Sequence, residues 1–203
     1  YLALFVGHSA YAQVIVLTIF LGGLSLGALA VGEISERLRR PLVAYAGVEL
    51  AVAVAGLFFH EIYTVLTEAA YQGVLPGSGG MGRWVVAGAM ILPQSVLLGT
   101  TFPLMSAALL RRTPGSPGRT LALLYFFNSI GAAIGALFAG FVLIGAVGLP
   151  GTVAVAGVLN AVVAGLAWLV GRSEETDPRA SVPAAVETEA ADPARVELLW
   201  RAL

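Results

Sequence analysis

Four polar side chains stand within otherwise apolar stretches of the sequence and carry groups that can bind a solute: Glu49, Thr100, Thr101 and Asn128. Glu49 follows Pro41 by eight residues, so a helix beginning at Pro41 would place the carboxyl group about 12 Å along its axis. Asn128 lies at the same depth in a stretch that begins at Thr120, and the two threonines approach that level from a third stretch. The spacing predicts one polar layer built from three helices.

Two interpretations of this layer stay open from the sequence. An acid inside an apolar span is costly unless it faces protein or water. In the first interpretation, Glu49 is protonated, or is hydrogen-bonded to Asn128 and the threonine hydroxyls, and holds helices together. In the second, Glu49 is the counter-ion of a small organic cation or a proton-relay group. The second interpretation makes Glu49, Asn128, Thr100 and Thr101 a substrate-binding site.

The composition requires a membrane around these residues. Of 203 residues, 58% are hydrophobic and only 11% are charged, against roughly 25% charged in an ordinary soluble domain. The mean hydropathy is +0.89. These values exclude a soluble enzyme and a nucleic-acid-binding protein. The chain has no Cys and only two His, so we expect no catalytic thiolate, no metal site and no cofactor.

Five stretches are long enough to cross a bilayer, which takes about 20 mostly apolar residues. They are approximately Ala10–Val31, Pro41–Leu66, Trp84–Leu110, Thr120–Val147 and Thr152–Val170. The pattern predicts an all-α, polytopic transmembrane bundle of about five spans over residues 1–170. Tyr1–His8 is apolar but too short to cross, and we interpret it as the end of a helix whose start is missing. The Gly148–Gly151 segment, Gly-Leu-Pro-Gly, predicts a tight turn.

The arginines predict the orientation of the bundle, because basic residues in short loops stay on the cytoplasmic side. All 11 basic residues are Arg, and only Arg83 falls on the side opposite to the other ten. The C-terminal tail is therefore expected to be cytoplasmic. Residues 171–191 read as an acidic Pro/Ala-rich linker. Asp192-Pro193 supplies a helix-capping residue and an N1 proline, so residues 192–203 are expected to begin a further helix.

Small residues and prolines shape the expected helix packing. The pairs Gly23/Gly27 and Gly131/Gly135 each have the spacing that lets two membrane helices approach closely. They predict either a tightly packed bundle or a dimerisation face. Pro93 and Pro103 lie inside the third span, where each removes a backbone hydrogen bond. The freed carbonyls are either satisfied locally or offered to a substrate by a broken helix.

Several segments resemble known families when they are taken together. Gly32–Arg40, GEISERLRR, is similar to the cytoplasmic loop motif of the major facilitator superfamily, with Arg39 where that motif usually has Gly. The segments that continue the resemblance, in chain order, are GHSAYA (7–12), FLGGLSLG (20–27), VEL (48–50), LGTTFPL (98–104) and LYFFNSIGAAIG (124–135). In combination they resemble the N-terminal transmembrane portion of membrane-embedded spermidine synthase-like proteins.

The resemblance implies a bundle like half of a major-facilitator fold in the bacterial inner (plasma) membrane. Full-length members join such a region to a cytosolic domain similar to aminopropyltransferases. This chain holds no Gly-rich nucleotide loop, so we expect no catalysis by the chain alone. The leading hypothesis is binding or translocation of a small organic cation such as a polyamine. The alternative is a non-transporting anchor or structural subunit. The expected partners are the lipid bilayer and other membrane helices, from the same protein, a second copy or another subunit.

Overall fold

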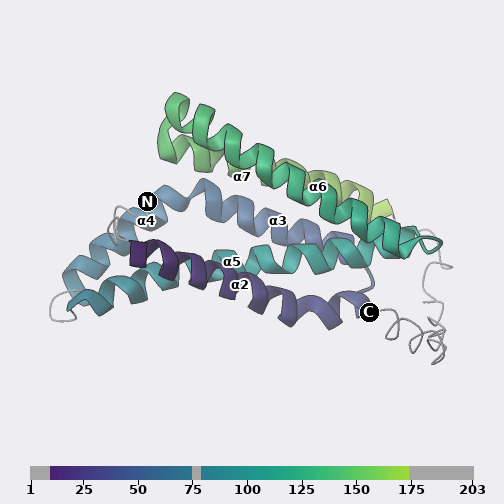
Figure 1. The fold of residues 1–203 in the computed structure, drawn as a ribbon, viewed down its shortest axis with the longest axis horizontal. Coiled ribbons are helices and arrows are strands. Elements are labelled where there is room, and N and C mark those ends of the chain that lie inside the picture. Colours follow the sequence, from purple (N-terminus) through teal and green to yellow (C-terminus); the bar gives the residue numbers. More distant parts are fainter. Residues whose placement is uncertain (1–9, 75–78, 174–203) are drawn as a thin grey trace, which may run out of the picture.

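The structure is a computed structural model that describes residues 10–74 and 79–173. Its elements, shown in Figure 1, are α2 (Ala10–Arg37), α3 (Pro41–Leu57), α4 (Phe59–Ala69), the π-helical turn η1 (Ala70–Val74), α5 (Gly79–Arg112), α6 (Pro117–Phe138), the π-helical turn η2 (Ala139–Leu143) and α7 (Ile144–Arg172). The described part of the chain contains no strand. The predicted all-α fold class is confirmed.

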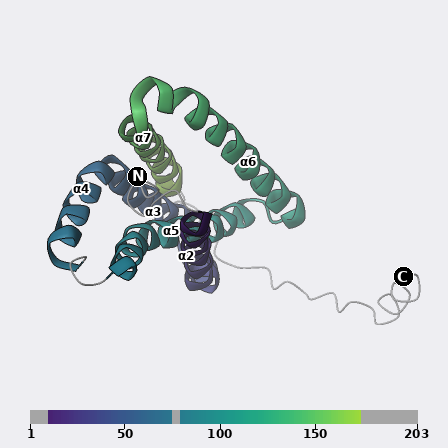
Figure 2. The ribbon, with the colours of Figure 1, turned by 60° about the vertical axis from the view of Figure 1, so that its left-hand side comes forward.

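The helices are long and apolar enough to cross a membrane. Three pass this test alone, and a fourth passes if the bent pair Pro41–Leu57 and Phe59–Gly73 is counted as one span. One of the three, Pro117–Arg172, has 56 residues, or about 84 Å of helix, which is far more than one crossing needs. Gly148 interrupts it with φ 70° and ψ −178°. The chain reverses there, so α6 and α7 form the two arms of a hairpin (Figure 2).

Helices α2 and α5 run in parallel and touch through small residues. An added Cβ at Gly27 would lie 3.0 Å from the Cα of Gly99, and one at Gly23 would lie 2.7 Å from the Cβ of Ser95. The Gly23/Gly27 spacing therefore acts inside the bundle. The Gly131/Gly135 pair on α6 differs, because an added Cβ at either position meets nothing within 4 Å.

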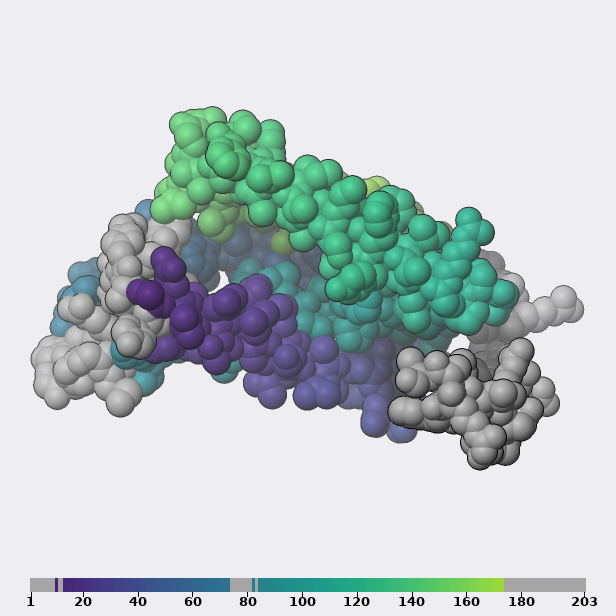
Figure 3. All heavy atoms as spheres, viewed as in Figure 1, coloured from purple at the N-terminus to yellow at the C-terminus, as the bar shows by residue number. Residues whose placement is uncertain are grey.

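Helix α3 lies between α5 and α7. Its contact with α7 is antiparallel, since Gly171 packs against Val43 and Gly157 packs against Leu57. A buried cluster joins α3, α5 and α7, and its members are Leu42, Ala46, Ala108 and Ala167. Tyr45 and Met105 pack against this cluster. Helix α3 therefore carries the centre of the bundle. By contrast, α6 has no buried residue, and it stands on the face seen in Figure 3.

The arginine-rich end of the bundle is held by hydrogen bonds from α5. Arg111 donates to the carbonyl of Glu36 at 2.6 Å and to that of Arg39 at 3.4 Å, and Arg112 donates to the carbonyl of Val170 at 3.5 Å. The carbonyls at a helix C-terminus lack partners within the helix and carry partial negative charge. The two guanidinium groups thus tie the ends of α2, α5 and α7 together.

The predicted span Pro41–Leu66 is not one straight helix. The chain bends by 62° at Phe58, between α3 and α4. The two helices also differ in polarity, because α3 carries one charged side chain in 17 residues, whereas α4 carries His60, Glu61 and Glu68 in 11. Helix α7 continues through Arg172. The predicted helix end at residues 1–8 and, from residue 174 onward, the predicted linker and further helix lie outside the described residues.

Candidate functional site

Glu49 is buried at the midpoint of α3. It is the ninth of the 17 residues of that helix, and its side chain is 7% exposed. It lies on the buried face of α3 together with Ala46, Val52 and Ala53. Helix α3 packs against both α5 and α7, so this face is turned toward protein. The sequence predicted a shielded acid at this position, and the burial of Glu49 agrees with that expectation.

Tyr45 is the direct partner of Glu49, and the sequence reasoning missed it. The two side chains lie close enough to interact, and a phenol is the hydrogen-bond donor to a carboxyl group that is ionised. Their spacing of four residues places them on the same face of α3, one turn apart. That spacing in an apolar span is the signal that would have revealed the pair. Tyr45 also packs against the central buried cluster, which holds its ring in place.

The two threonines lie on α5, which stays helical through both of its prolines. Thr100 is buried and Thr101 is half-buried. Their hydroxyls donate to the carbonyls of Leu97 and Leu98, each at 2.7 Å. The sequence left open whether Pro93 and Pro103 break this helix. Helix α5 is continuous through both prolines, and the threonine hydroxyls bond to carbonyls of the same helix.

The packing register brings the threonines near the level of Glu49. Helices α3 and α5 run in opposite directions (Figure 1), and Tyr45 and Met105 pack against the same cluster. Glu49 is one turn further along α3 from Tyr45, and Thr101 is about one turn back along α5 from Met105. The three polar groups therefore stand at about the same height in the bundle.

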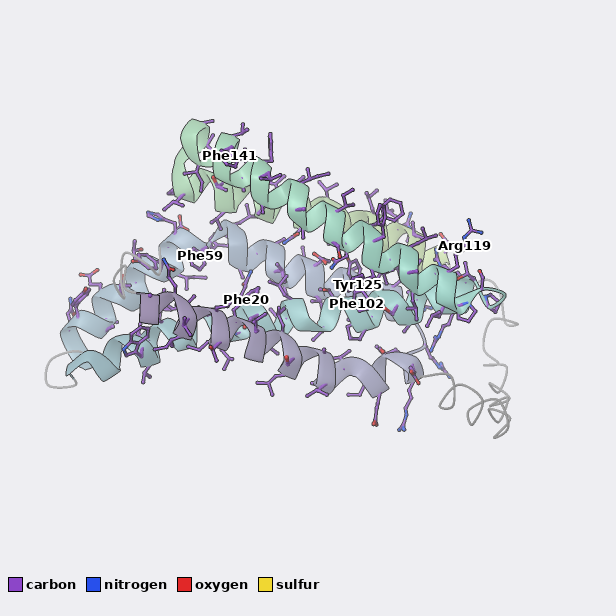
Figure 4. All side chains as sticks on the ribbon, in the orientation of Figure 1. Phe20, Phe59, Phe102, Arg119, Tyr125 and Phe141 are labelled. Atoms are coloured by element: carbon purple, nitrogen blue, oxygen red, sulfur yellow. The ribbon has the colours of Figure 1, made fainter. Side chains whose placement is uncertain are left out.

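Asn128 differs from the other three residues because it lies on α6, which has no buried residue. It is exposed on α6, three residues after Tyr125. The rings of Tyr125 and Phe102 meet edge to face with centroids 6.4 Å apart, which is the aromatic contact between α6 and α5 (Figure 4). In the part of the chain that the structure describes, no hydrogen bond joins any two of Glu49, Thr100, Thr101 and Asn128.

Ser106 is a second polar group that the sequence reasoning missed. Its hydroxyl oxygen on α5 is buried, and it has no hydrogen-bond partner among the described residues. A buried hydroxyl in this state loses the hydrogen bonds that water would give it. It lies next to Met105 and so extends the polar groups of α5 from Thr100 and Thr101 toward the arginine-rich end.

The chemical groups at the centre of α3 are the carboxyl group of Glu49 and the phenol ring of Tyr45. Glu49 supplies a carboxyl group shielded from water, and an aromatic ring such as that of Tyr45 has a face that can attract a cationic group. No set of three or more His, Cys, Asp or Glu side chains is placed to hold a metal ion within residues 10–74 and 79–173.

The fold and this buried acid define the class: a multi-pass, all-α membrane protein whose central helix carries a shielded carboxyl group. The family model of the Major Facilitator Superfamily matches residues 3–203. The chain belongs to that superfamily, as the resemblance of the Gly32–Arg40 loop predicted. No curated protein and no solved structure matches the chain.

Proposed function

We propose that this chain forms the membrane region of a transporter that binds or translocates a small organic cation, of which a polyamine is the best candidate. The observation that carries the proposal is the buried Glu49 at the centre of α3, one turn from Tyr45. A carboxylate kept among apolar side chains is expensive, and such groups in membrane helices are most often functional. Thr100 and Thr101 add hydroxyls at the same height, and Asn128 completes the proposed site from α6 if that helix moves inward.

A polyamine fits this site because its charges are separated by methylene groups. One ammonium group pairs with Glu49, and the methylene chain lies against apolar and aromatic side chains. We further propose that the chain is the transmembrane portion of a spermidine synthase-like protein, which would couple the membrane region to an enzyme acting on the same solute. The sequence segments that resemble that family support this step.

The proposed orientation places the arginine-rich end in the cytoplasm of a bacterial inner membrane. Seven arginines lie at the end of the bundle where α2, α5 and α7 end and where α3 and α6 begin. They are Arg37, Arg39, Arg40, Arg111, Arg112, Arg119 and Arg172. Basic residues in short loops are retained on the cytoplasmic side. The C-terminal tail, which follows α7, would leave the bundle on that side.

The test is the replacement Glu49→Gln, which keeps the size of the side chain and removes its charge. We expect the uptake or binding of labelled spermidine by the chain in liposomes to fall by at least about tenfold, or ~1.4 kcal/mol. Tyr45→Phe should cause a smaller loss, because the ring stays and only the hydroxyl group is removed.

The matched control is Glu33→Gln, since Glu33 is an exposed acid on α2 away from the proposed site. It should leave spermidine uptake unchanged, and circular dichroism should show that all three variants stay helical. Unchanged uptake by a folded Glu49→Gln variant would remove the proposal that Glu49 is the counter-ion of the solute.

A second candidate function is that of a non-transporting anchor or structural subunit. The observation that favours it is α6, which has no buried residue and whose Gly131 and Gly135 have open space beside them. Such a face suits contact with helices of a second copy or another subunit. Mass measurement of the purified chain in lipid nanodiscs distinguishes the two, because an obligatory subunit should be recovered as an oligomer and should show no spermidine uptake.

A further inference from the structure

Helix α4 turns away from the axis of α3 and contacts the rest of the bundle along one face. It leaves α3 at 62°, and none of its 11 residues is buried. Helix α3 by itself has 17 residues, or about 25 Å of helix, which is near the thickness of a bilayer core of about 30 Å. Helix α4 therefore begins close to the level at which the apolar core of the membrane ends, on the side opposite to the arginine-rich end.

The side chains of α4 separate into three faces when they are placed 100° apart around the helix. Phe59, Tyr63 and Thr67 are half-buried and lie on one face, turned toward the protein. A second face is apolar and exposed, with Ile62 43%, Val65 65% and Leu66 41% accessible. The third face is polar and exposed, and its members are His60, Glu61, Thr64 and Glu68. Water can form hydrogen bonds only with the polar face. The exposed apolar face therefore needs an apolar partner.

The inner corner of the bend between α3 and α4 is an apolar groove of about 720 Å³. Its lining residues are Gly47, Leu50, Ala51, Val54, Ala55, Phe58 and Ile62. None of these side chains can form a hydrogen bond, so water in the groove would lose partners. Ile62 belongs both to the groove and to the exposed apolar face of α4, so the two surfaces are continuous.

We propose that α4 is an interfacial helix that lies in the plane of the membrane surface. Its exposed apolar face rests on the acyl chains of the leaflet farther from the arginine-rich end, and the same acyl chains fill the groove. The polar face then meets water and headgroups. A helix with one apolar and one polar face has this position at a membrane surface.

The charge on α4 indicates which interaction with lipid holds the helix at the membrane surface. The polar face carries the acids Glu61 and Glu68 and no Arg, so anionic headgroups would be repelled by it and not attracted. The helix is therefore held by its apolar area, and it should keep its position in a purely zwitterionic bilayer. This property separates it from basic amphipathic helices, which need anionic lipid.

The test uses the natural absence of Cys from the chain, which lets a single nitroxide label be attached at one introduced Cys. The informative pair is Val65→Cys and Thr64→Cys, two neighbours on different exposed faces of α4. In phosphatidylcholine vesicles, we expect the label at position 65 to collide with oxygen more than with a water-soluble nickel chelate. The label at position 64 should show the reverse preference.

Leu29→Cys provides the lipid-facing reference, since Leu29 on α2 is 79% exposed. Val54→Cys reports on the groove and should also favour oxygen. Two results would overturn the proposal. Oxygen preference at both 64 and 65 would mean that α4 continues the membrane crossing of α3, and nickel preference at both would mean that α4 stands in water.

Discussion

The variant Gly99→Ala is expected to unfold more easily than the parent chain, by about 2–3 kcal/mol in the free energy of unfolding. The reason is the backbone contact between α2 and α5. A Cβ at position 99 would lie 2.8 Å from both the Cα and the carbonyl carbon of Leu24, and a backbone cannot turn aside as a flexible side chain can. The two helices must separate along their parallel contact, and overpacking of this kind costs about 1–3 kcal/mol.

The contact between Gly99 and α2 also includes Gly27, so the loss extends beyond one residue. Membrane helices gain little from burying apolar surface against one another, and close packing supplies much of their attraction. Separating α2 from α5 therefore weakens all the contacts that the two helices share, from Gly23 at one end to the Arg111 hydrogen bonds at the other.

The matched control is Gly22→Ala on α2, where an added Cβ meets nothing within 4 Å. Alanine is the better helix former by about 1 kcal/mol, so this variant should be as stable as the parent or slightly more so. Titration with sodium dodecyl sulfate in detergent micelles, followed by circular dichroism, measures both. Equal midpoints for Gly99→Ala and Gly22→Ala would show that α2 and α5 do not pack as described.

The second large effect is expected at the reversal between α6 and α7. Gly148 has φ 70° and ψ −178°, a backbone conformation that is almost restricted to glycine and costs other residues about 1–3 kcal/mol. Gly148→Ala should lower the free energy of unfolding by that amount. The carbonyl of Gly148 also accepts a hydrogen bond from the Thr152 hydroxyl at 2.8 Å, which would be disturbed if the turn relaxed.

Gly145→Ala is the comparison for this turn. Gly145 lies three residues earlier, an added Cβ there meets nothing within 4 Å, and its φ is not positive. It should stabilise the hairpin slightly, as alanine does in a helix. The same detergent titration applies to both variants. A Gly148→Ala variant as stable as Gly145→Ala would mean that the chain does not reverse through this conformation.

Much of the architecture could be predicted from the composition and from a few punctuating residues. The low charge and the long apolar stretches determined a polytopic helical bundle. Pro41 and Pro117 mark the first turns of α3 and α6, because proline fits where no helical hydrogen bond is lost. The reversal at Gly148 followed from its Gly-Leu-Pro-Gly context, since glycine permits a positive φ and proline fixes its own φ.

The candidate site was predicted only in part. The burial of Glu49 followed from the cost of exposing an acid to lipid. Its partner Tyr45 did not, because the position of the Tyr45 ring depends on its packing against the central buried cluster. The assignment of Asn128 to the same site remains a prediction, since α6 diverges from the bundle in this structure (Figure 2).

The sequence by itself determined which segments are long and apolar enough to cross a membrane, because that depends on the transfer of each segment from water to lipid. Only the tertiary structure decided which faces meet. Gly23/Gly27 and Gly131/Gly135 have the same spacing, yet only the first pair is packed against another helix. The spans are apolar on all sides, so the pattern of residues contains no polar face that would orient them. The close contact of Gly27 with Gly99, and the packing of the Tyr45 ring against the central buried cluster, depend on the fit between helices.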